Sequence, residues 1–511
     1  MKIIEGVIIV TFMMSPVALF AEEAAIGFDK NAYIATADTR KILRIGMVDC
    51  VAMALKANSE IQIKAILPKI EDANVKIQKA KFEPKVYLDF LMEDSKELSP
   101  TTLTDQATTK TKTGTLNFGY EELFVTGTKL NVDMFNTRTV SNSAIQSLNP
   151  EYDSELQFTI TQPLLKGFGV IVQKAQFLIA KNNKLVSNQE FKNNVITVLT
   201  NTKKTFYEFQ YSKEQYGVAA TSLRRVQDLH DINKEKYIKG LASNVDLLES
   251  EAEVARMEQA LYSAEGIMEK ADDDLKYITN MVDDVELWNA DIVLIDKLDY
   301  EKKEPKLTAE IITAFDHRPD YEALKIDLKS KDINIIFYMN NVFPTLDLVA
   351  SYSLNGLANY YEKDLRRIGG GKYPDWTLGA TFKLPLFSDK EKGEFEKSKL
   401  DKARVLIAFK RLEQKIVLEV RNAVRDVDIN YRKLEASRIS KEAETKNYEA
   451  QESRFRAGLV STLDMLLYQE RMARAELAFL RSVIDYNISL AELARVKGTT
   501  LIEDNITLEL T

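Results

Sequence analysis

The chain has 511 residues, of which 45% are hydrophobic and 29% are charged, an ordinary composition for a folded protein. Its formal net charge of −8 leaves no basic excess to neutralise phosphates, which argues against nucleic-acid binding. The single cysteine, Cys50, excludes a disulfide within the chain. Together with His230 and His317 it is too scattered along the sequence for a structural zinc site.

Residues 1–21 have the pattern of an export signal, because Lys2 precedes an apolar run that ends at Ala21. A buried N-terminal strand or a membrane anchor would fit the same run. Cys50 lies too far downstream to carry a lipid, so we expect no lipoprotein. We expect an N-terminal extension at 22–46. After residue 21 no apolar stretch reaches the ~20 residues of a membrane-spanning helix, so a mature membrane protein would have to be a β-barrel.

Two long segments without proline, after Pro163 and after Pro385, predict long helices. Each contains a glycine that is followed by a helix-capping residue, which indicates a turn between two helices. In the first repeat, 47–280, we expect three helices at 47–82, 168–238 and 244–280. The first of them would be interrupted or kinked at Pro68. The helix at 168–238 would be roughly 105 Å long at 1.5 Å per residue.

The second half of the chain repeats this arrangement. After a linker at 281–307, we expect a second repeat at 308–497 and a C-terminal tail at 498–511. Its predicted helices cover 308–342, 389–455 and 461–497.

An offset of 218 residues places Gly240 on Gly458, and an offset of 260 places Pro84 on Pro344. An insertion before Pro163 explains why the offsets differ. A tandem duplication accounts for both, although alanine-rich helices can resemble one another by chance.

Segments of alternating polarity predict β-strands at about 84–164 and at 344–386. The first range includes a hairpin, 112–137, with Gly127 near its turn. Charges stay on the polar side of the alternation, which is typical of a transmembrane barrel, although a soluble sheet with one dry face gives the same pattern. Four to six strands cannot close a barrel without open edges. Three copies would supply about twelve strands, or about eighteen if the hairpin takes part, and the sequence leaves both counts open.

The order of these elements, present twice, resembles the TolC-type outer-membrane efflux and secretion channels over residues 44–498. The most specific motif is Phe455-Arg456-Ala457-Gly458-Leu459-Val460-Ser461 before Asp464. Weaker matches are Thr161-Gln162-Pro163-Leu164-Leu165 and Ala54-Leu55-Lys56-Ala57-Asn58-Ser59-Glu60-Ile61, the latter echoed by 317–321. The resemblance implies an α+β membrane protein built from two tandem repeats. In such a protein a homotrimeric transmembrane β-barrel is continued by a long periplasmic α-helical barrel.

The resemblance also implies a function. The trimer would lie in the cell outer membrane, in contact with its lipid, and reach into the periplasm. It would be the exit duct of a tripartite efflux pump or a type I secretion system. Substrates would pass through it passively from an inner-membrane transporter and a periplasmic adaptor (membrane fusion protein). No enzyme activity, cofactor or metal is expected. An exported coiled-coil scaffold without channel activity and a non-conducting outer-membrane adhesin are the alternatives. The sequence does not indicate the substrate or the type of pump.

Members of this family dock their adaptor at the periplasmic helix turns and close the pore with acidic side chains. The positions here that match the docking turns are Gly240, Leu241, Ser243, Arg456, Gly458, Leu459 and Ser461. Asp464 matches one acidic gate position, but the second, three residues on, is Leu467. Asp246 and Glu249 hold the corresponding positions in the first repeat. The two aspartates could instead merely stabilise helix N-termini through the helix dipole. The 281–307 segment would form a belt around the helical barrel.

Overall fold

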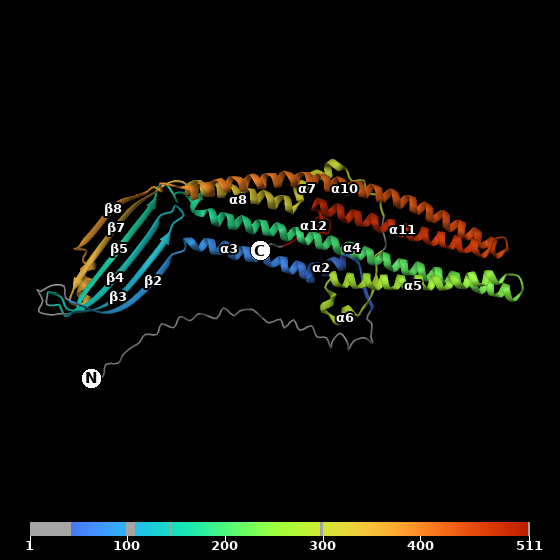
Figure 1. Ribbon diagram of the computed structural model, residues 1–511, viewed down its shortest axis with the longest axis horizontal. Helices are drawn as coiled ribbons and strands as arrows, with labels where there is room; N and C mark the ends of the chain where they lie inside the picture. Colours follow the sequence, from blue (N-terminus) through green and yellow to red (C-terminus); the bar gives the residue numbers. More distant parts are fainter. Residues whose placement is uncertain (1–41, 99–107, 144, 297–299, 509–511) are drawn as a thin grey trace, which may run out of the picture.

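The computed structural model describes residues 42–98, 108–143, 145–296 and 300–508. The expected export signal, 1–21, and residues 22–41 of the expected extension lie outside this part. The molecule is elongated, with a β-sheet at one end and paired helices that run to the opposite end (Figure 1). None of the helices in the described ranges has the length and apolar character needed to cross a membrane.

The sheet has six antiparallel strands in the order β2-β3-β4-β5-β7-β8. Their bounds are β2 Lys85–Leu98, β3 Thr108–Leu123, β4 Lys129–Ser141, β5 Glu151–Pro163, β7 Thr345–Ala358 and β8 Pro374–Lys383. The hairpin predicted at 112–137 is therefore the β3–β4 pair, and it lies inside the sheet between β2 and β5. Gly127, in its turn, has φ of +95°, a backbone conformation that favours glycine. Each chain thus contributes six strands.

One face of this sheet is apolar, because opposed residues in an antiparallel ladder point to the same side. Large apolar side chains that are exposed on this side come from five of the six strands: Val86, Leu88, Phe90, Phe118, Phe158, Ile160, Tyr352, Leu378 and Phe382. We call this side the apolar face. The other side, the polar face, carries mainly threonine, serine, asparagine and acidic residues, including Asn117, Asp133, Gln157 and Thr381.

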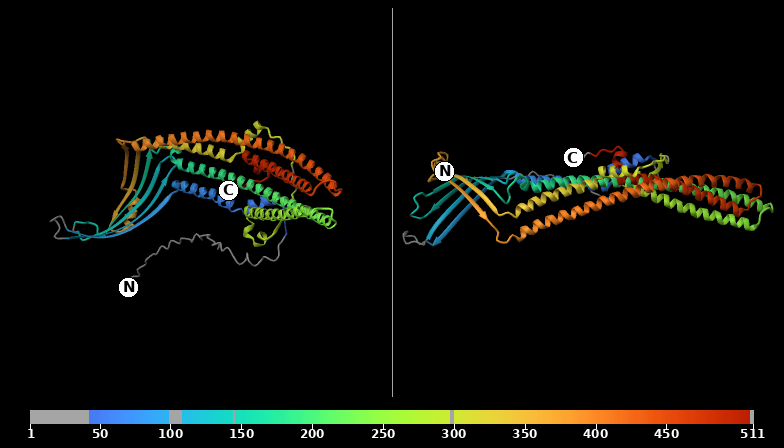
Figure 2. Two further views of the ribbon diagram at one scale, coloured as in Figure 1. Left: turned by 45° about the vertical axis from the view of Figure 1, so that its right-hand side comes forward. Right: turned by 90° about the horizontal axis from the view of Figure 1, so that it is seen from above.

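The helices repeat with the offsets seen in the sequence (Figure 2). In the first repeat they are α2 Met47–Ala57, α3 Ser59–Lys79, α4 Val170–Ile238 and α5 Asn244–Ile278. In the second they are α7 Leu307–His317, α8 Pro319–Asn341, α10 Asp389–Arg456 and α11 Thr462–Lys497. Two elements break the symmetry. The β3–β4 hairpin is inserted in the first repeat, and a short helix, α9 Tyr361–Gly369, is inserted between β7 and β8.

The first predicted helix, 47–82, is interrupted at Asn58, so the interruption predicted at Pro68 is wrong. Asn58 has an extended backbone, and its side chain accepts hydrogen bonds from the N–H groups of Glu60 and Ile61, which starts α3. Pro68 lies inside α3 without ending it. The equivalent break in the second repeat falls at Arg318, before Pro319 at the first position of α8.

Parts of the predicted N-terminal extension and of the predicted linker form strands and short helices in the middle of the molecule. Ile42–Ile45 form β1, which pairs in parallel with β6, Asp291–Leu294. Between α5 and β6 the chain forms a 3-10 turn, Met281–Asp283, and a short helix, α6 Val285–Trp288. This layer covers a core that includes Ile45, Phe206, Phe209, Leu275, Met281 and Ile292.

Two further segments are fixed to the helices. Tyr486 of α11 donates a hydrogen bond to the carbonyl of Glu301 at 2.9 Å and accepts one from the N–H of Lys303 at 2.9 Å. The expected C-terminal tail forms α12, Thr500–Glu503, after which Ile506 and Leu508 pack against α2 and α4. Residues 301–303 and 500–508 are therefore fixed to the helices.

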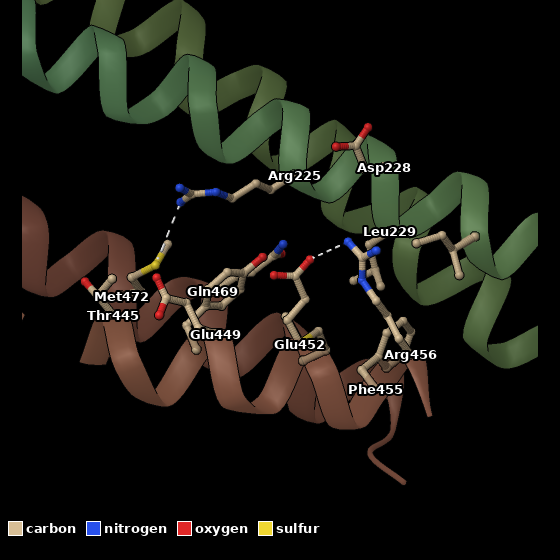
Figure 3. A pocket seen from close by; sticks show the side chains of 13 residues that line it. Arg225, Asp228, Leu229, Thr445, Glu449, Glu452, Phe455, Arg456, Gln469 and Met472 are labelled. Atoms are coloured by element: carbon tan, nitrogen blue, oxygen red, sulfur yellow. Dashed lines mark hydrogen bonds and ion pairs between the residues drawn. The ribbon is translucent and has the colours of Figure 1, made fainter. Parts of the chain in front are cut away.

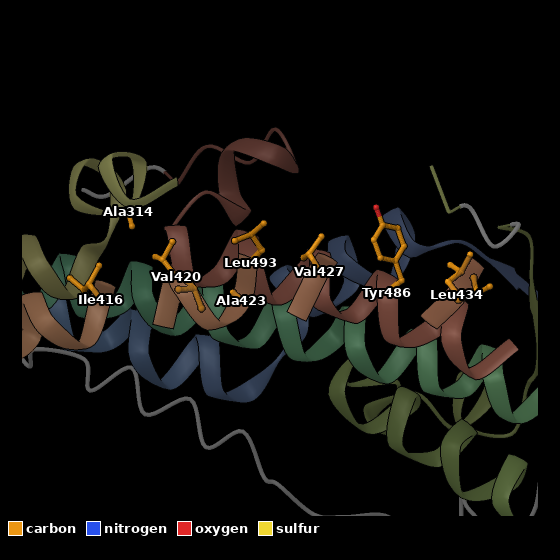
Figure 4. Packing of buried hydrophobic residues seen from close by; sticks show 10 residues of the cluster. Ala314, Ile416, Val420, Ala423, Val427, Leu434, Tyr486 and Leu493 are labelled. Carbon is orange, nitrogen blue, oxygen red and sulfur yellow. The ribbon is translucent and has the colours of Figure 1, made fainter. Parts of the chain in front are cut away.

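The largest core lies between α10 and α11 (Figure 4). It is built from small and branched side chains spaced along both helices, among them Ile416, Val420, Val427 and Leu434 of α10. Tyr486 is fully buried among them. Such close packing holds each long helix to its neighbour, and packing of this kind supplies most of the stability of helices in proteins.

Candidate functional site

Both predicted turns lie at the end of the molecule that is farthest from the sheet (Figure 1). We call this end the tip; it comprises 239–243 and 457–461. Gly240 has φ of +71° and Gly458 of +78°. In each turn the glycine N–H and the following leucine N–H donate to carbonyls of the preceding helix, so that both helices end in the same way. Leu241 and Leu459 are 76% and 69% exposed.

Ser243 and Ser461 start the helices that leave the tip. In α5 the Ser243 hydroxyl accepts from the N–H of Asp246 at 3.2 Å and donates to its carboxylate at 2.7 Å. In α11 the Ser461 hydroxyl is placed in the same way relative to Asp464, at 3.1 and 2.7 Å. The hydrogen bonds from the hydroxyl and the backbone N–H of Ser243 hold the pKa of Asp246 below its ordinary value. The two serines are therefore the N-caps; Asp246 completes a capping box by accepting from the Ser243 N–H, and Asp464 accepts from the Ser461 hydroxyl.

The caps give a first testable expectation. Replacing Ser243 or Ser461 with alanine should destabilise its own tip turn by about 1 kcal/mol, because one N–H loses its acceptor. Hydrogen exchange of the amides at 244–247 or 462–465 should accelerate about fivefold, while exchange in the α10–α11 core stays unchanged. Acceleration spread evenly over both helices would contradict a local capping role.

The Asp246 cap should also depend on pH. A carboxylate whose pKa is lowered by folding contributes stability above its unfolded pKa and loses it as the pH falls through the folded value. The α5 end of the tip should therefore loosen only below about pH 4, near the unperturbed pKa of aspartate.

The three predicted gate residues lie close to the tip, and Asp246 of α5 is near Thr462, the first residue of α11. Asp464 is exposed, Asp246 and Glu249 are half-buried, and they lie on two different helices. Leu467 and Leu463, which share the first turns of α11 with Asp464, are also exposed. A ring of carboxylates would have to come from several copies of the chain. The geometry of a single copy is thus satisfied by the capping role alone.

Sequence reasoning missed a set of contacts that join α4 to the α10–α11 pair just above the tip (Figure 3). The guanidinium of Arg225 lies 5.6 Å from the ring centre of Tyr448 and 3.9 Å from the sulfur of Met472. The ammonium of Lys236 lies 4.2 Å from the ring centre of Phe455. We call these contacts, together with a hydrogen bond between Thr462 and Asn233, the tip locks.

The third contact is buried. The Thr462 hydroxyl lies 3.2 Å from the side-chain oxygen of Asn233, so α11 is tied to α4 at its first residue. A hydrogen bond of this kind contributes about 0.5–1.5 kcal/mol, and a cation–π contact about 0.5–2 kcal/mol. The three together can hold the inner helices against α4.

A groove of about 330 Å³ lies among these contacts. Its walls carry opposite charges, with Asp228, Glu449 and Glu452 beside Arg225 and Arg456. Arg456, predicted at the docking tip, pairs with Glu452 at 2.8 Å on its own helix and lines this groove. No pattern within α4 or α10 alone indicates these residues, because the contacts depend on how two helices far apart in sequence align.

Comparison with known families identifies the second repeat. Residues 312–499 match the family described as outer membrane efflux protein. Over this range the chain is similar to that family. The matched range includes Gly458 and Ser461 of the tip, Asp464, part of α7, and all of α8, α10 and α11. A search of curated proteins gives no match.

Solved structures extend the likeness to both repeats. The CmeC outer membrane channel of Campylobacter jejuni has a TM-score of 0.66 at 16% identity, over 89% of this chain and 86% of that one. The open state of the MtrE outer membrane channel of Neisseria gonorrhoeae gives 0.63 at 15% identity, over 89% of each chain. The outer membrane protein VceC of Vibrio cholerae gives 0.64 at 12% identity, over 88% and 96%. The chain has the fold of the TolC-type outer membrane efflux proteins.

The family match lies in the second half of the chain. Gly240, Ser243 and Asp246 are related to the matched half through the internal duplication, which gives both tip turns the same backbone geometry. The roles expected for these residues at the tip remain predictions. Among the residues that the structure describes, no group of histidine, cysteine or acidic side chains is arranged to hold a metal ion.

Proposed function

We propose that three copies of this chain form a passive exit duct in the outer membrane. The single observation that carries the proposal is the combination of one dry face and two open edges in the same six-stranded sheet. Lipid would cover the apolar face, and the polar face would line a water-filled lumen, as in transmembrane barrels. The chain would reach the membrane by export and without a lipid anchor.

The open edges are β2 and β8, which have a partner on one side only. Every residue of β8 and all but one of β2 is exposed, whereas the four central strands are largely half-buried. Unpaired strand edges expose backbone N–H and C=O groups, which cannot be left unsatisfied in lipid. Pairing of β8 in one copy with β2 in the next would remove both edges.

The helices beside these edges carry matching apolar stripes. On α3 the exposed isoleucines recur by seven, at Ile63, Ile70 and Ile77. On α10 Leu400 and Ile407 are exposed with the same spacing. In Figure 1 β2 and α3 lie along one long side of the molecule, and β8 and α10 along the other. Such a contact joins two different surfaces, so it closes into a ring when the rotation allows.

A three-membered ring would have about eighteen strands, since three copies of six-stranded sheets close one barrel. The helices would continue as a hollow shaft toward the tip. We assign the tip turns, with exposed Leu241 and Leu459, to docking of a periplasmic adaptor that connects to an inner-membrane transporter. The partner system is a tripartite efflux pump or a type I secretion system. Because the duct only conducts, no catalytic step is assigned to it.

The competing function is an exported coiled-coil scaffold without channel activity. A scaffold has no use for a sheet whose exposed large side chains are mostly on one face. Incorporation of the purified chain into planar lipid bilayers separates the two. The proposal predicts discrete, long-lived conductance steps, and a chain that never conducts under conditions where it inserts would favour the scaffold.

Asp464 gives a specific expectation for the duct. Three copies of its carboxylate near one axis would attract cations and repel anions. Asp464→Asn retains an acceptor for capping but loses the charge, so its effect reports the pore and not the cap. We expect cation selectivity and block by divalent cations to weaken severalfold. Ser461→Ala, which weakens the cap and keeps the charge, is the matched control. Unaltered selectivity in Asp464→Asn would remove Asp464 from the gate.

A further inference from the structure

The apolar face of the sheet changes character toward its loop end, which is the end away from the helices. Along β2 the side chains on this face are Val86, Leu88, Phe90 and Met92, followed by Asp94 and Lys96. The neighbouring strands change at the same level. From the level of Met92 onward this face carries four cations and one carboxylate, together with the apolar Leu98 and Val140. We call the cations Lys96, Lys110, Lys112 and Arg138 the outer basic cluster.

The polar face has the opposite sign at the same level. Its side chains there include Glu93, Glu97 and Glu151, and Asp153 and Glu155 lie on the same face nearer the helices. A barrel made from this sheet would thus be basic on the outside and acidic on the inside near its loop end. The charge on the outside lies directly above the apolar band, where the headgroups of membrane lipids would be.

A groove of about 300 Å³ lies at this transition on the apolar face. Its walls are Phe90 and Met92 of β2, Leu116 of β3, and the rings of Tyr152 and Tyr361. This volume is at the lower limit for small-ligand pockets, and the lining is mainly apolar with a few polar groups at one end. An extended hydrocarbon chain suits such a groove.

Helix α9 closes one side of the groove. Tyr361, its first residue, donates a hydrogen bond to the side-chain oxygen of Asn136 at 3.2 Å, and its ring centre lies 5.9 Å from that of Tyr152. Asp364 is fully buried against the sheet and accepts from the Ser154 hydroxyl. The helix is therefore held on the outward side of β5 and β7, where a transmembrane barrel meets lipid.

Arg138 stands at the polar end of the groove. Its Nε donates to the Tyr152 hydroxyl at 3.1 Å, and its guanidinium lies 5.9 Å from the Tyr152 ring centre. This contact orients the side chain and uses one of its five N–H donors. Lys112, on the adjacent strand, pairs with Asp94 at 3.1 Å, and both are well exposed. Two cations above an apolar groove match a phosphate above an acyl chain.

We propose that this groove binds an acyl chain of a phosphate-bearing membrane lipid, whose phosphate contacts Arg138 and Lys112. The proposal rests on the proposed function, since it requires the apolar face to lie in a membrane. The lipid would fill the space between β2, β4 and α9 and fix the height of the barrel in the bilayer. Each copy of the chain would hold one such lipid.

Native mass spectrometry of the full chain in neutral detergent, with added diphosphorylated lipid A, tests the proposal. We expect up to one retained lipid per chain, and at least tenfold weaker retention of the dephosphorylated lipid. Inorganic phosphate at millimolar concentration should not displace it, because the groove recognises the acyl chain as well. Equal retention of the phosphorylated and dephosphorylated lipids would overturn the proposal.

Two variants and one control sharpen the test. The double variant Lys112→Gln and Arg138→Gln should lower retention at least tenfold. Gly114→Leu should do the same by filling the groove, because Gly114 lines it and a Cβ atom added there meets no atom within 4 Å. Lys129→Gln, which removes a cation from the polar face, should leave retention unchanged. Unchanged retention in both groove variants would contradict the site.

Conductance of the same preparations separates this proposal from the one on which it rests. Variants that conduct like the unaltered protein but lose the lipid support the groove. An unaltered protein that conducts but shows no preference for the phosphorylated lipid overturns the groove alone. A protein that neither conducts nor retains any lipid overturns the duct as well.

Discussion

Replacing Ile63 and Ile70 of α3 with glutamate is expected to leave the chain monomeric. The two side chains are 63% and 50% exposed in one copy, and the proposed ring buries them against α10 of the next copy. Burial of each isoleucine contributes about 1.5–3 kcal/mol, and a glutamate in its place would bury an unpaired charge. Because a ring repeats this contact at every junction between copies, the loss of binding free energy occurs once for each junction. Light scattering after size-exclusion chromatography in detergent measures the result.

Ile145 supplies the matched control for this experiment. It is 67% exposed but lies between β4 and β5, away from the sides that carry α3 and α10. Ile145→Glu should therefore leave the trimer intact. A trimer that persists in the Ile63 and Ile70 double variant would show that these helices do not form the junction.

Weakening the tip locks is expected to open the duct. Removal of the Arg225 guanidinium, in Arg225→Ala, should cost the closed arrangement about 1–2 kcal/mol, because the contact with Tyr448 is partly shielded from water. If the closed form dominates, that free energy raises the open fraction about 5- to 30-fold. Single-channel recording measures the open probability directly.

A double-mutant cycle assigns this effect to the contact itself. Tyr448→Leu removes the ring while keeping an apolar side chain in a position that is largely buried. If the cation and the ring act on one another, the two changes together should raise the open probability by less than the product of their separate effects. Arg432→Ala, which breaks an exposed pair with Asp428 on one helix, should have no effect. Full additivity would contradict the lock.

Much of the helical architecture could be predicted because the signals that define it are local. Proline is disfavoured inside helices, and a glycine followed by a serine marks a turn. With these two signals, the helix predicted at 168–238 differs from α4 by two residues at its start. Local signals can also compete. Pro68 drew the predicted break away from Asn58, whose side chain caps α3 through two N–H groups. The position of the helix break is therefore set by the Asn58 cap and not by Pro68.

The parts that could not be predicted depend on distant segments. β1 is four residues long and exists because β6, about 250 residues away, pairs with it. Arg225 and Tyr448 lie in two long helices without a local signal that singles out either residue. Their contact depends on how α4 and α10 align, which neither helix sequence indicates by itself. The same holds for α9. Its docking depends on Asp364 reaching Ser154 in a strand of the other repeat.

The number of strands in the sheet likewise depends partly on local signals and partly on distant segments. Alternating polarity indicated the hairpin at 112–137, but it could not decide whether the hairpin joined the main sheet. Register decides it, because β3 pairs with β2 along its length and β4 pairs with β5. A sheet that would otherwise have four strands has six, and a barrel made from three copies becomes correspondingly wider.

Single-particle imaging of the full chain in detergent or nanodiscs tests the central claim most directly, because it shows whether several copies enclose one continuous hollow. The account predicts a three-fold ring in which β8 of each copy pairs with β2 of the next, with a tunnel running from the strands to the tip. A compact single copy with both strand edges free, or an assembly without a central opening, would contradict it.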